Sequence, residues 1–138
     1  MNRVVLVACA SRKVEHGARA AELYVSDLFR LSLAFARTLR PQAIFILSAK
    51  HGLVHPDDVL DPYDLTLNSI PLAEVKTWSD VVFRQLQGRT NVDTDHFIFL
   101  AGQRYRRFLE PRLRSTEVPM VGLGIGKQIQ YLKRKLDE

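Results

Sequence analysis

The sequence contains only one cysteine, Cys9, among its 138 residues. One cysteine cannot form a disulfide within the chain, and it cannot supply a zinc site built from several cysteines. No apolar run approaches the roughly 20 residues that a membrane-spanning helix requires. The apolar stretch at residues 4–7 is too short for the core of a signal peptide, and no cleavage site follows it. We therefore expect a soluble, cytoplasmic protein with no membrane partner.

Repeats, low-complexity tracts and room for a second domain are also missing. A chain of 138 residues is long enough for one ordinary domain and too short for two. Apolar residues make up 46% and charged residues 25%, which is typical of a globular protein and argues against disorder. We expect a single domain over residues 1–138.

The excess of positive charge is confined to one part of the chain. The formal net charge is +5, yet residues 1–100 contain 11 basic and 11 acidic side chains, so the whole excess lies in the last 38 residues. Such a segment is typical either of a phosphate-binding face or of the solvated surface of a helix. The sequence leaves both interpretations open.

Four apolar runs predict buried strands, each bounded by turn residues, as in a parallel sheet that is covered on both faces. Amphipathic segments predict helices between and after them. This alternation indicates an α/β fold, in three α/β/α layers, with a central, mostly parallel, four-stranded sheet. The predicted strands are residues 4–10, 43–49, 96–101 and 119–123; the predicted helices are 24–40, 71–87, 103–114 (bent at Pro111) and 126–136.

The long segment at residues 51–70 is predicted to be irregular and functional, because loops of this length in a compact domain are rarely mere linkers. In open α/β sheets, ligands bind beyond the carboxyl ends of the strands. Small residues together with polar or cationic ones follow all four predicted strands, at residues 9–13, 48–52, 102–105 and 122–127. These segments are the predicted ligand site.

The first of these segments offers a thiol beside two cations. Cys9 is either a small apolar residue of the core or a catalytic thiol, since a nearby cation favours the thiolate. Ser11 and Lys13 are predicted ligand contacts.

The second segment offers an amine and an imidazole. We predict that Lys50 makes electrostatic and hydrogen-bonding contacts with a ligand, oriented by Asp64 in preference to Asp61. His51 is a candidate general acid or base, and Gly52 can adopt a positive φ that turns the chain. The alternative is a solvent-facing lysine and a histidine in a turn.

The last segment, Gly122-x-Gly124-x-Gly126-Lys127, resembles a phosphate cradle at the start of a helix. Its spacing fits neither a Walker motif nor a dinucleotide-binding fingerprint. The loop carboxylates and histidines match no recognised metal-ligand spacing, so we predict no metal and no cofactor.

Three tyrosines, Tyr24, Tyr63 and Tyr105, lie beside these segments and could stack on a base, although each could equally pack in the core. Tyr63 is the strongest candidate because it lies in a polar turn. The remaining predicted binding residues are Ser26, Ser48 and Gly102.

Five motifs stand out along the chain: Cys9-Ala10-Ser11-x-Lys13, Ala20-x-x-Leu23-Tyr24-x-Ser26-x-x-Phe29, Leu47-Ser48-Ala49-Lys50-x-Gly52-Leu53-Val54-x-Pro56, Pro62-Tyr63-Asp64 and Gly124-Ile125-Gly126-Lys127-Gln128. Together, they resemble a family of small bacterial and phage proteins of unassigned activity. That family is similar to the catalytic core of archaeosine synthase, whose pattern runs Pro-Cys-Ser, a Lys, then Tyr-x-x-Ser-x-x-His. The resemblance to the small family covers nearly the whole chain, whereas the likeness to the synthase is confined to the first third.

Carried over residue by residue, four positions match the synthase pattern: Cys9, Lys13, Tyr24 and Ser26. Three depart from it: Ala8 replaces the Pro, Ala10 the Ser, and Phe29 the His. The resemblance implies a fold like that of uracil-DNA glycosylases and a pocket for a nucleobase or modified nucleoside.

The predicted function is an enzyme that acts on a nucleobase or nucleotide, by modified-base synthesis or base removal. The alternative is a nucleotide- or nucleic-acid-binding module without turnover. The oligomeric state stays open. The candidate catalytic residues are Cys9, Lys50, His51 and Asp64, and the candidate binding residues are Ser11, Lys13, Tyr24, Ser26, Ser48, Gly52, Tyr63, Gly102, Tyr105, Gly124, Gly126 and Lys127.

Overall fold

A central five-stranded sheet organises the computed structural model, which describes residues 2–138. The strands are β1 (Arg3–Ala8), β3 (Ala43–Ser48), β4 (Gly52–Val54), β6 (His96–Leu100) and β7 (Ser115–Glu117), in the spatial order β4-β3-β1-β6-β7. All neighbouring pairs are parallel except β3 with β4. The prediction of an α/β fold with a mostly parallel sheet is confirmed.

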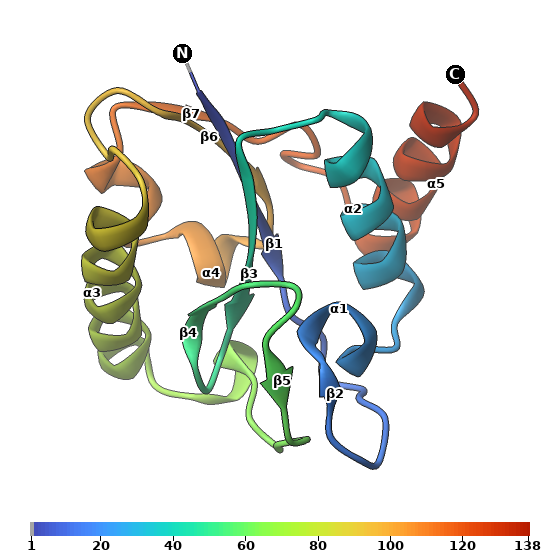
Figure 1. Cartoon of the computed structure of the whole chain (residues 1–138), viewed down its shortest axis with the longest axis horizontal. Coiled ribbons are helices and arrows are strands. Elements are labelled where there is room, and N and C mark those ends of the chain that lie inside the picture. Colours follow the sequence, from blue (N-terminus) through green and yellow to red (C-terminus); the bar gives the residue numbers. More distant parts are fainter. Residues whose placement is uncertain (1) are drawn as a thin grey trace.

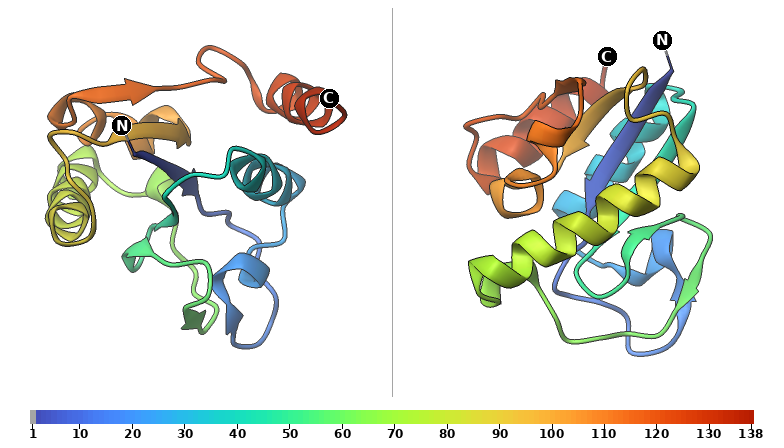
Figure 2. Two further views of the ribbon diagram at one scale, coloured as in Figure 1. Left: turned by 45° about the horizontal axis from the view of Figure 1, so that its top comes forward. Right: turned by 90° about the vertical axis from the view of Figure 1, so that its left-hand side faces the viewer.

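Helices cover both faces of this sheet (Figure 1). On one face, α2 (Asp27–Thr38) packs beside α5 (Ile125–Leu136), and on the other lie α3 (Leu72–Arg89) and the short α4 (Gln103–Arg106). Figure 2 shows α3 crossing the sheet on the side opposite α2 and α5. Alternate residues of β1 enter two separate cores, Val4 and Leu6 on the α3 side and Val5 and Val7 on the α2 side.

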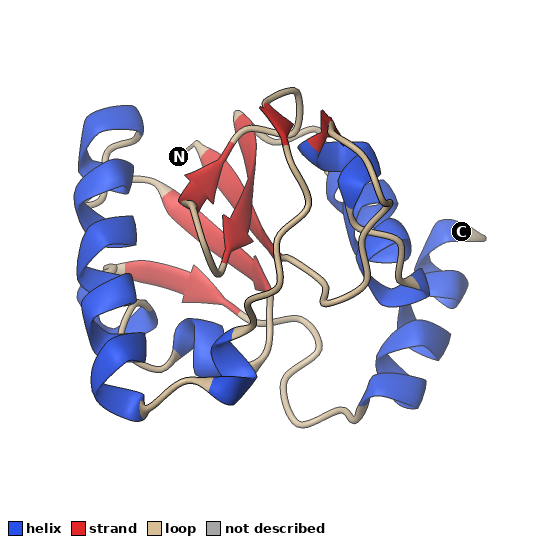
Figure 3. Ribbon diagram, turned by 90° about the horizontal axis from the view of Figure 1, so that it is seen from below, coloured by secondary structure: helices blue, strands red, loops and turns tan. Residues whose placement is uncertain are grey.

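The connections place a switch point at β1. From β1 the chain crosses through α2 to β3 on one side, and after α3 it returns to β6 on the other side of β1. Loops that follow β1 and β6 therefore leave in opposite directions, which opens a crevice between their carboxyl ends. Figure 3 looks onto this edge of the sheet.

The sheet has one strand more than the sequence predicts. Residues 52–54 were assigned to the irregular segment, but they form β4, which pairs antiparallel with the end of β3. A tight turn makes this possible, because Gly52 has a φ of +74°. Leu53 is fixed from outside the sheet, since its N–H donates to Gln85 Oε1 (2.8 Å).

The predicted strand at residues 119–123 is wrong, and the fourth parallel strand is β7. This edge strand is short and polar, so it leaves no apolar run in the sequence. The apolar residues that follow it form turns instead, in which Val121 N–H bonds the carbonyl of Val118 and Leu123 N–H bonds that of Met120. Gly122 there has a φ of +78°.

The predicted helix boundaries also need correction. The helix expected at residues 103–114 is divided into α4 and a 3-10 turn, η2 (Glu110–Arg112), around Pro111. The helix expected from residue 24 starts at Asp27, because Ser26 caps it by accepting the N–H of Phe29. Gly88 lies inside α3 rather than beyond its end.

The segment at residues 51–70 is more ordered than predicted. Beyond β4, it contains β5 (Val59–Leu60) and a 3-10 turn, η1 (Leu67–Ser69). β5 pairs with β2 (Ala18–Arg19), which leads into α1 (Ala20–Leu23). These elements pack together at the carboxyl end of the sheet (Figure 3). No helix among residues 2–138 is both long and apolar enough to span a bilayer.

Candidate functional site

A cavity of about 330 Å³ lies at the carboxyl ends of β1 and β6. Its buried walls come from Phe29 and Ser32 of α2, Leu100 of β6 and Tyr105 of α4, and its rim is made of exposed residues. The volume is within the range of small-molecule sites. Five of the candidate site residues predicted from the sequence are found in the lining: Cys9, Ser11, Ser26, Gly102 and Tyr105.

Cys9 lies at the boundary between this cavity and the core. Its Sγ atom is 3.3 Å from Tyr105 Oη, and its backbone N–H donates to the carbonyl of Leu47 (3.0 Å), which continues the sheet ladder by one residue. Burial raises the pKa of Tyr105 well above its ordinary value, and a negative charge on Cys9 adds to this effect. The phenol therefore stays protonated near neutral pH and can donate to the sulfur.

Three hydroxyl groups form a chain beneath the loop that carries Tyr63. Tyr63 Oη lies 2.7 Å from Tyr24 Oη and 2.7 Å from Ser48 Oγ. Burial raises the pKa of both tyrosines above the ordinary value. The three predicted binding residues thus meet, but their hydroxyl groups are occupied by one another.

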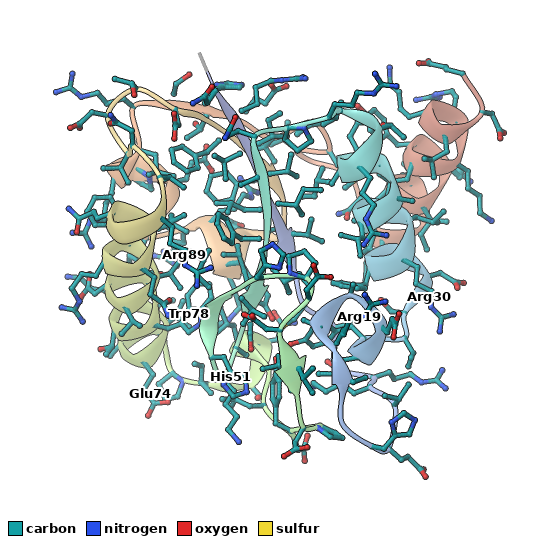
Figure 4. The ribbon with its side chains drawn as sticks, in the orientation of Figure 1. Arg19, Arg30, His51, Glu74, Trp78 and Arg89 are labelled. Atoms are coloured by element: carbon teal, nitrogen blue, oxygen red, sulfur yellow. The ribbon has the colours of Figure 1, made fainter. Side chains whose placement is uncertain are left out.

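Ser48 is held in this chain from two further directions. Its Oγ accepts the N–H of His51 (3.1 Å), and its carbonyl accepts the indole N–H of Trp78 (2.8 Å). Figure 4 shows Trp78 extending from α3 toward the strands. The end of β3, the segment after it and α3 are therefore fixed together at one serine.

Lys13 occupies the position that was predicted for Lys50. Its ammonium lies 4.1 Å from the centre of the Tyr63 ring and 3.0 Å from the carbonyl oxygen of Ser11. Burial lowers the pKa of Lys13 from its ordinary value, and the nearby Cys9 and Asp64 only partly offset that effect. Ser11, Lys13, Tyr63 and Asp64 also line an open groove of about 380 Å³, which meets the cavity at Ser11.

The predicted pairing of Lys50 with Asp64 or Asp61 is not formed. Lys50 is exposed, and its side chain makes no ion pair or hydrogen bond with any residue in the described part of the chain. The turn at Gly52 carries Lys50 outward, past the end of β3. Asp64 faces Lys13 instead.

His51 is exposed but packs edge-on against the ring of Tyr63, with 5.5 Å between the ring centres. Burial, followed by the charge of Lys50, lowers its pKa below the ordinary value. Neither His51 nor Lys50 lines the 330 Å³ cavity. Their predicted catalytic roles have no geometric support there.

The glycine-rich segment begins α5 as predicted, with Gly124 as the residue before the first helical turn. Ile125 lines the rim of the cavity, and the first turn of α5 contains no acidic residue. Gly126 and Lys127 are exposed and are not part of the lining. The predicted binding residues Gly124, Gly126 and Lys127 are therefore outside the lining, and the segment adjoins the cavity only through Ile125.

Sequence reasoning named none of the other lining residues as site residues; the polar ones among them are Arg12, Ser32, Thr66, Asn68 and Gln128. Ser32 carried a signal, because it is a polar residue in the apolar stripe of a helix. Asn68 lies in η1 and Thr66 caps it by accepting the N–H of Asn68, and Arg104 fixes this turn by donating to the carbonyls of Leu67 and Ile70. No pattern in the sequence predicts that contact.

Several of the basic side chains in the C-terminal segment make hydrogen bonds or ion pairs that stabilise the fold. Besides Arg104, Arg106 pairs with Glu110 at 3.1 Å and Arg112 with Asp80 at 2.8 Å. Across residues 2–138, no group of three or more metal-ligating side chains is placed to hold a metal ion.

Residues 4–134 match DUF6884, which is described as a family of unknown function. The chain belongs to this family. It is also 29% identical to "Uncharacterized protein YfjM" of Bacillus subtilis (strain 168), in an alignment that covers 100% of this chain and 97% of the relative. No solved structure matches the chain. The expectation of a family without an assigned activity is confirmed, whereas the links to archaeosine synthase and uracil-DNA glycosylases stay predictions.

Proposed function

We propose that this chain is an enzyme that binds a nucleobase or nucleotide in the 330 Å³ cavity, with Cys9 as the catalytic residue. The observation that carries this proposal is the hydrogen-bonded pair of Cys9 and Tyr105 at the cavity wall. A thiol with a protonated phenol beside it combines a nucleophile with a hydrogen-bond donor. The position at the switch point of the sheet supports the same proposal.

The lining is suited to a flat heterocycle with polar edges. Phe29, Leu100 and Tyr105 provide apolar and aromatic surface, and Ser26, Ser32 and Asn68 provide hydroxyl and amide groups. Sites that receive a base combine stacking surface with a few polar contacts of this kind. Genuinely empty cavities are apolar, whereas the polar groups of this lining call for a polar occupant.

The archaeosine synthase pattern supports the assignment only in part. Two matching residues, Cys9 and Lys13, interact electrostatically, and Ser26 shares the cavity with Cys9. In contrast, Phe29 stands where the pattern has histidine, and its buried side chain forms part of the cavity wall. Proton transfer at that position is unavailable to this chain, so we propose a related pocket and a different reaction. A uracil-DNA-glycosylase-like fold is part of the same proposal.

A nucleic-acid-binding module without turnover is the second candidate. It would rest on the basic C-terminal segment, but Arg104, Arg106 and Arg112 are bound to carbonyls or carboxylates of the fold. The cations without an ion pair among the described residues of this segment, such as Arg107 and Lys133, lie on different elements. The cavity is therefore the better-supported site.

The single cysteine gives a direct test. Iodoacetamide can modify only Cys9, so the rate of alkylation, followed by mass spectrometry, reports whether the cavity is occupied. We expect some members of a panel of nucleobases, nucleosides and nucleotides, including modified ones, to slow the alkylation several-fold. Cys9→Ala should fold, at a cost near 1 kcal/mol, and lose turnover of any ligand that protects. Alkylation that no member of the panel slows would contradict the proposal.

A further inference from the structure

Ser32 is a buried residue whose hydroxyl group makes no hydrogen bond to any other residue within 2–138. Its side chain is 3% exposed, and it lines the cavity. Other hydroxyl groups on helices of this protein bond back to the preceding turn, as Ser79 does to the carbonyl of Val75 (3.0 Å) and Thr77 to that of Ala73 (3.2 Å). Ser32 makes no such bond. Because no fully buried side-chain polar atom of the described residues lacks a hydrogen-bond partner, the Ser32 hydroxyl is open to the cavity, where a ligand can bond it.

The rim of the same cavity carries unpaired positive charge. Arg12 is exposed and lines the cavity, and its guanidinium makes no ion pair within the described chain. Ile125, also in the lining, begins the 12-residue helix α5, whose first turn carries no acidic side chain. The first turn of α2 differs, because it already contains Asp27. Arg12 and the first turn of α5 therefore form an electropositive rim.

The closed and open ends of the cavity thus have different chemistry. A neutral hydroxyl, Ser32, lies among the buried walls, and the positive groups lie where solvent can reach them. A ligand that satisfies both ends has an uncharged polar ring at one end and an anionic group at the other. A nucleoside monophosphate has this arrangement.

On the basis of the proposed function, we propose that the ligand is a single nucleoside monophosphate, bound with its base toward Ser32 and its phosphate at Arg12 and the first turn of α5. Ser32 then acts as a specificity-determining residue, because it can hydrogen-bond a ring nitrogen or an exocyclic group. Arg12 contributes a charge-assisted hydrogen bond to the phosphate. A cavity of about 330 Å³ is at the small end of ligand sites, which fits one nucleotide better than a strand.

The test compares the common nucleosides, their 5′-monophosphates and short oligonucleotides by isothermal titration and by protection of Cys9 from alkylation. We expect a monophosphate to bind about tenfold or more tightly than its nucleoside. Arg12→Gln should remove that difference and leave the affinity for the nucleoside unchanged. Ser32→Ala should lower the affinity for the nucleoside and for the monophosphate by the same factor, about threefold to tenfold.

Two control variants are available in the chain. Arg30→Gln removes an exposed cation that points away from the sheet on the outer side of α2 (Figure 4), and Ser79→Ala removes a buried helical hydroxyl outside the cavity. Neither should change any affinity. Circular dichroism checks that all four variants are folded.

The outcomes separate this inference from the function on which it rests. Equal affinity for nucleoside and monophosphate, or a phosphate contribution that survives Arg12→Gln, would overturn the inference and leave a base-binding cavity. Tighter binding of an oligonucleotide than of any monophosphate would also overturn it, in favour of a polynucleotide ligand. If no base, nucleoside or nucleotide of either panel binds, the proposed function itself is wrong.

Discussion

The Sγ atom of Cys9 lies 3.3 Å from the phenol oxygen of Tyr105, and the two residues are 96 positions apart in the sequence. Cys9 follows β1 and Tyr105 lies in α4, which begins just after β6. β1 and β6 are neighbouring parallel strands, so their carboxyl ends bring the two residues together. The sheet topology thus places a hydrogen-bond donor beside the only thiol of the chain.

Tyr105→Phe should slow the reaction of Cys9 with iodoacetamide. The raised pKa of Tyr105 keeps its phenol protonated, so it can donate a hydrogen bond to the sulfur in its reactive, negatively charged form. Loss of one such bond should reduce the rate about threefold to tenfold near pH 8. Tyr131→Phe, a change on α5 outside the cavity, is the control. A rate that is unchanged or higher in Tyr105→Phe would show that the phenol does not assist the thiol.

Tyr63→Phe should destabilise the protein more than Tyr24→Phe. The Tyr63 hydroxyl makes two 2.7 Å bonds, to Ser48 and to Tyr24, whereas the Tyr24 hydroxyl makes one bond of this length, to Tyr63, beside an interaction with Ser48. Removing the central group leaves two partly buried hydroxyls without this partner, at about 2 kcal/mol, and removing the terminal group costs about 1 kcal/mol. Urea unfolding followed by circular dichroism measures both. Equal losses would mean that the three hydroxyls do not act as a connected chain.

Local patterns predicted most of the parallel sheet, because its three inner strands are buried on both faces and therefore consist of continuous apolar runs in the sequence. β7 and β4 escaped prediction for opposite reasons. The edge strand Ser115–Glu117 is too polar to stand out, and Gly52–Val54 is too short to be separated from the loop. In both cases pairing with an existing strand, rather than intrinsic propensity, determines the structure.

Candidate site residues that directly follow β1 and β6 line the cavity, whereas most of the others do not. Cys9, Ser11 and Gly102 line the cavity because strand ends fix their positions. Lys50 also follows a strand, but the turn that starts β4 directs it to solvent, and a turn direction cannot be derived from strand order. Ser32 lies mid-helix, where only the orientation of α2 decides that it faces a cavity.

The free energy of unfolding should fall as the pH rises above about 10. Burial raises the pKa values of Tyr24, Tyr63 and Tyr105 above their ordinary value of 10.0. Above that pH the unfolded chain loses protons that the folded chain keeps, so the folded state binds more protons and is destabilised by each increase in pH. Lys13 opposes this effect just below pH 10.5, because its lowered pKa makes the unfolded chain bind more protons there.

Absorbance at 295 nm and circular dichroism, recorded together during an alkaline titration, check this expectation. Most of the tyrosinate signal should appear together with the loss of secondary structure. Tyr63→Phe should reduce the amplitude of that late phase. Ionisation of all four tyrosines near pH 10 in a chain that remains folded would contradict the raised pKa values.

Arg104→Met should loosen η1 and the cavity wall that it carries. The guanidinium of Arg104 donates to the carbonyls of Leu67 and Ile70, one at each end of the segment that contains Asn68. Methionine keeps much of the apolar stem but leaves both carbonyls without this donor, at about 1.5–3 kcal/mol for bonds from a charged group. Opening of this segment should therefore become about tenfold to a hundredfold more frequent, which hydrogen exchange at residues 66–71 measures by mass spectrometry.

The matched control is Arg107→Met, since Arg107 is an exposed neighbour whose guanidinium makes no ion pair with the described residues. Equal exchange in the two variants would show that η1 is held by its own turn bonds, such as Ser69 N–H to the carbonyl of Thr66, and that Arg104 contributes little to the cavity.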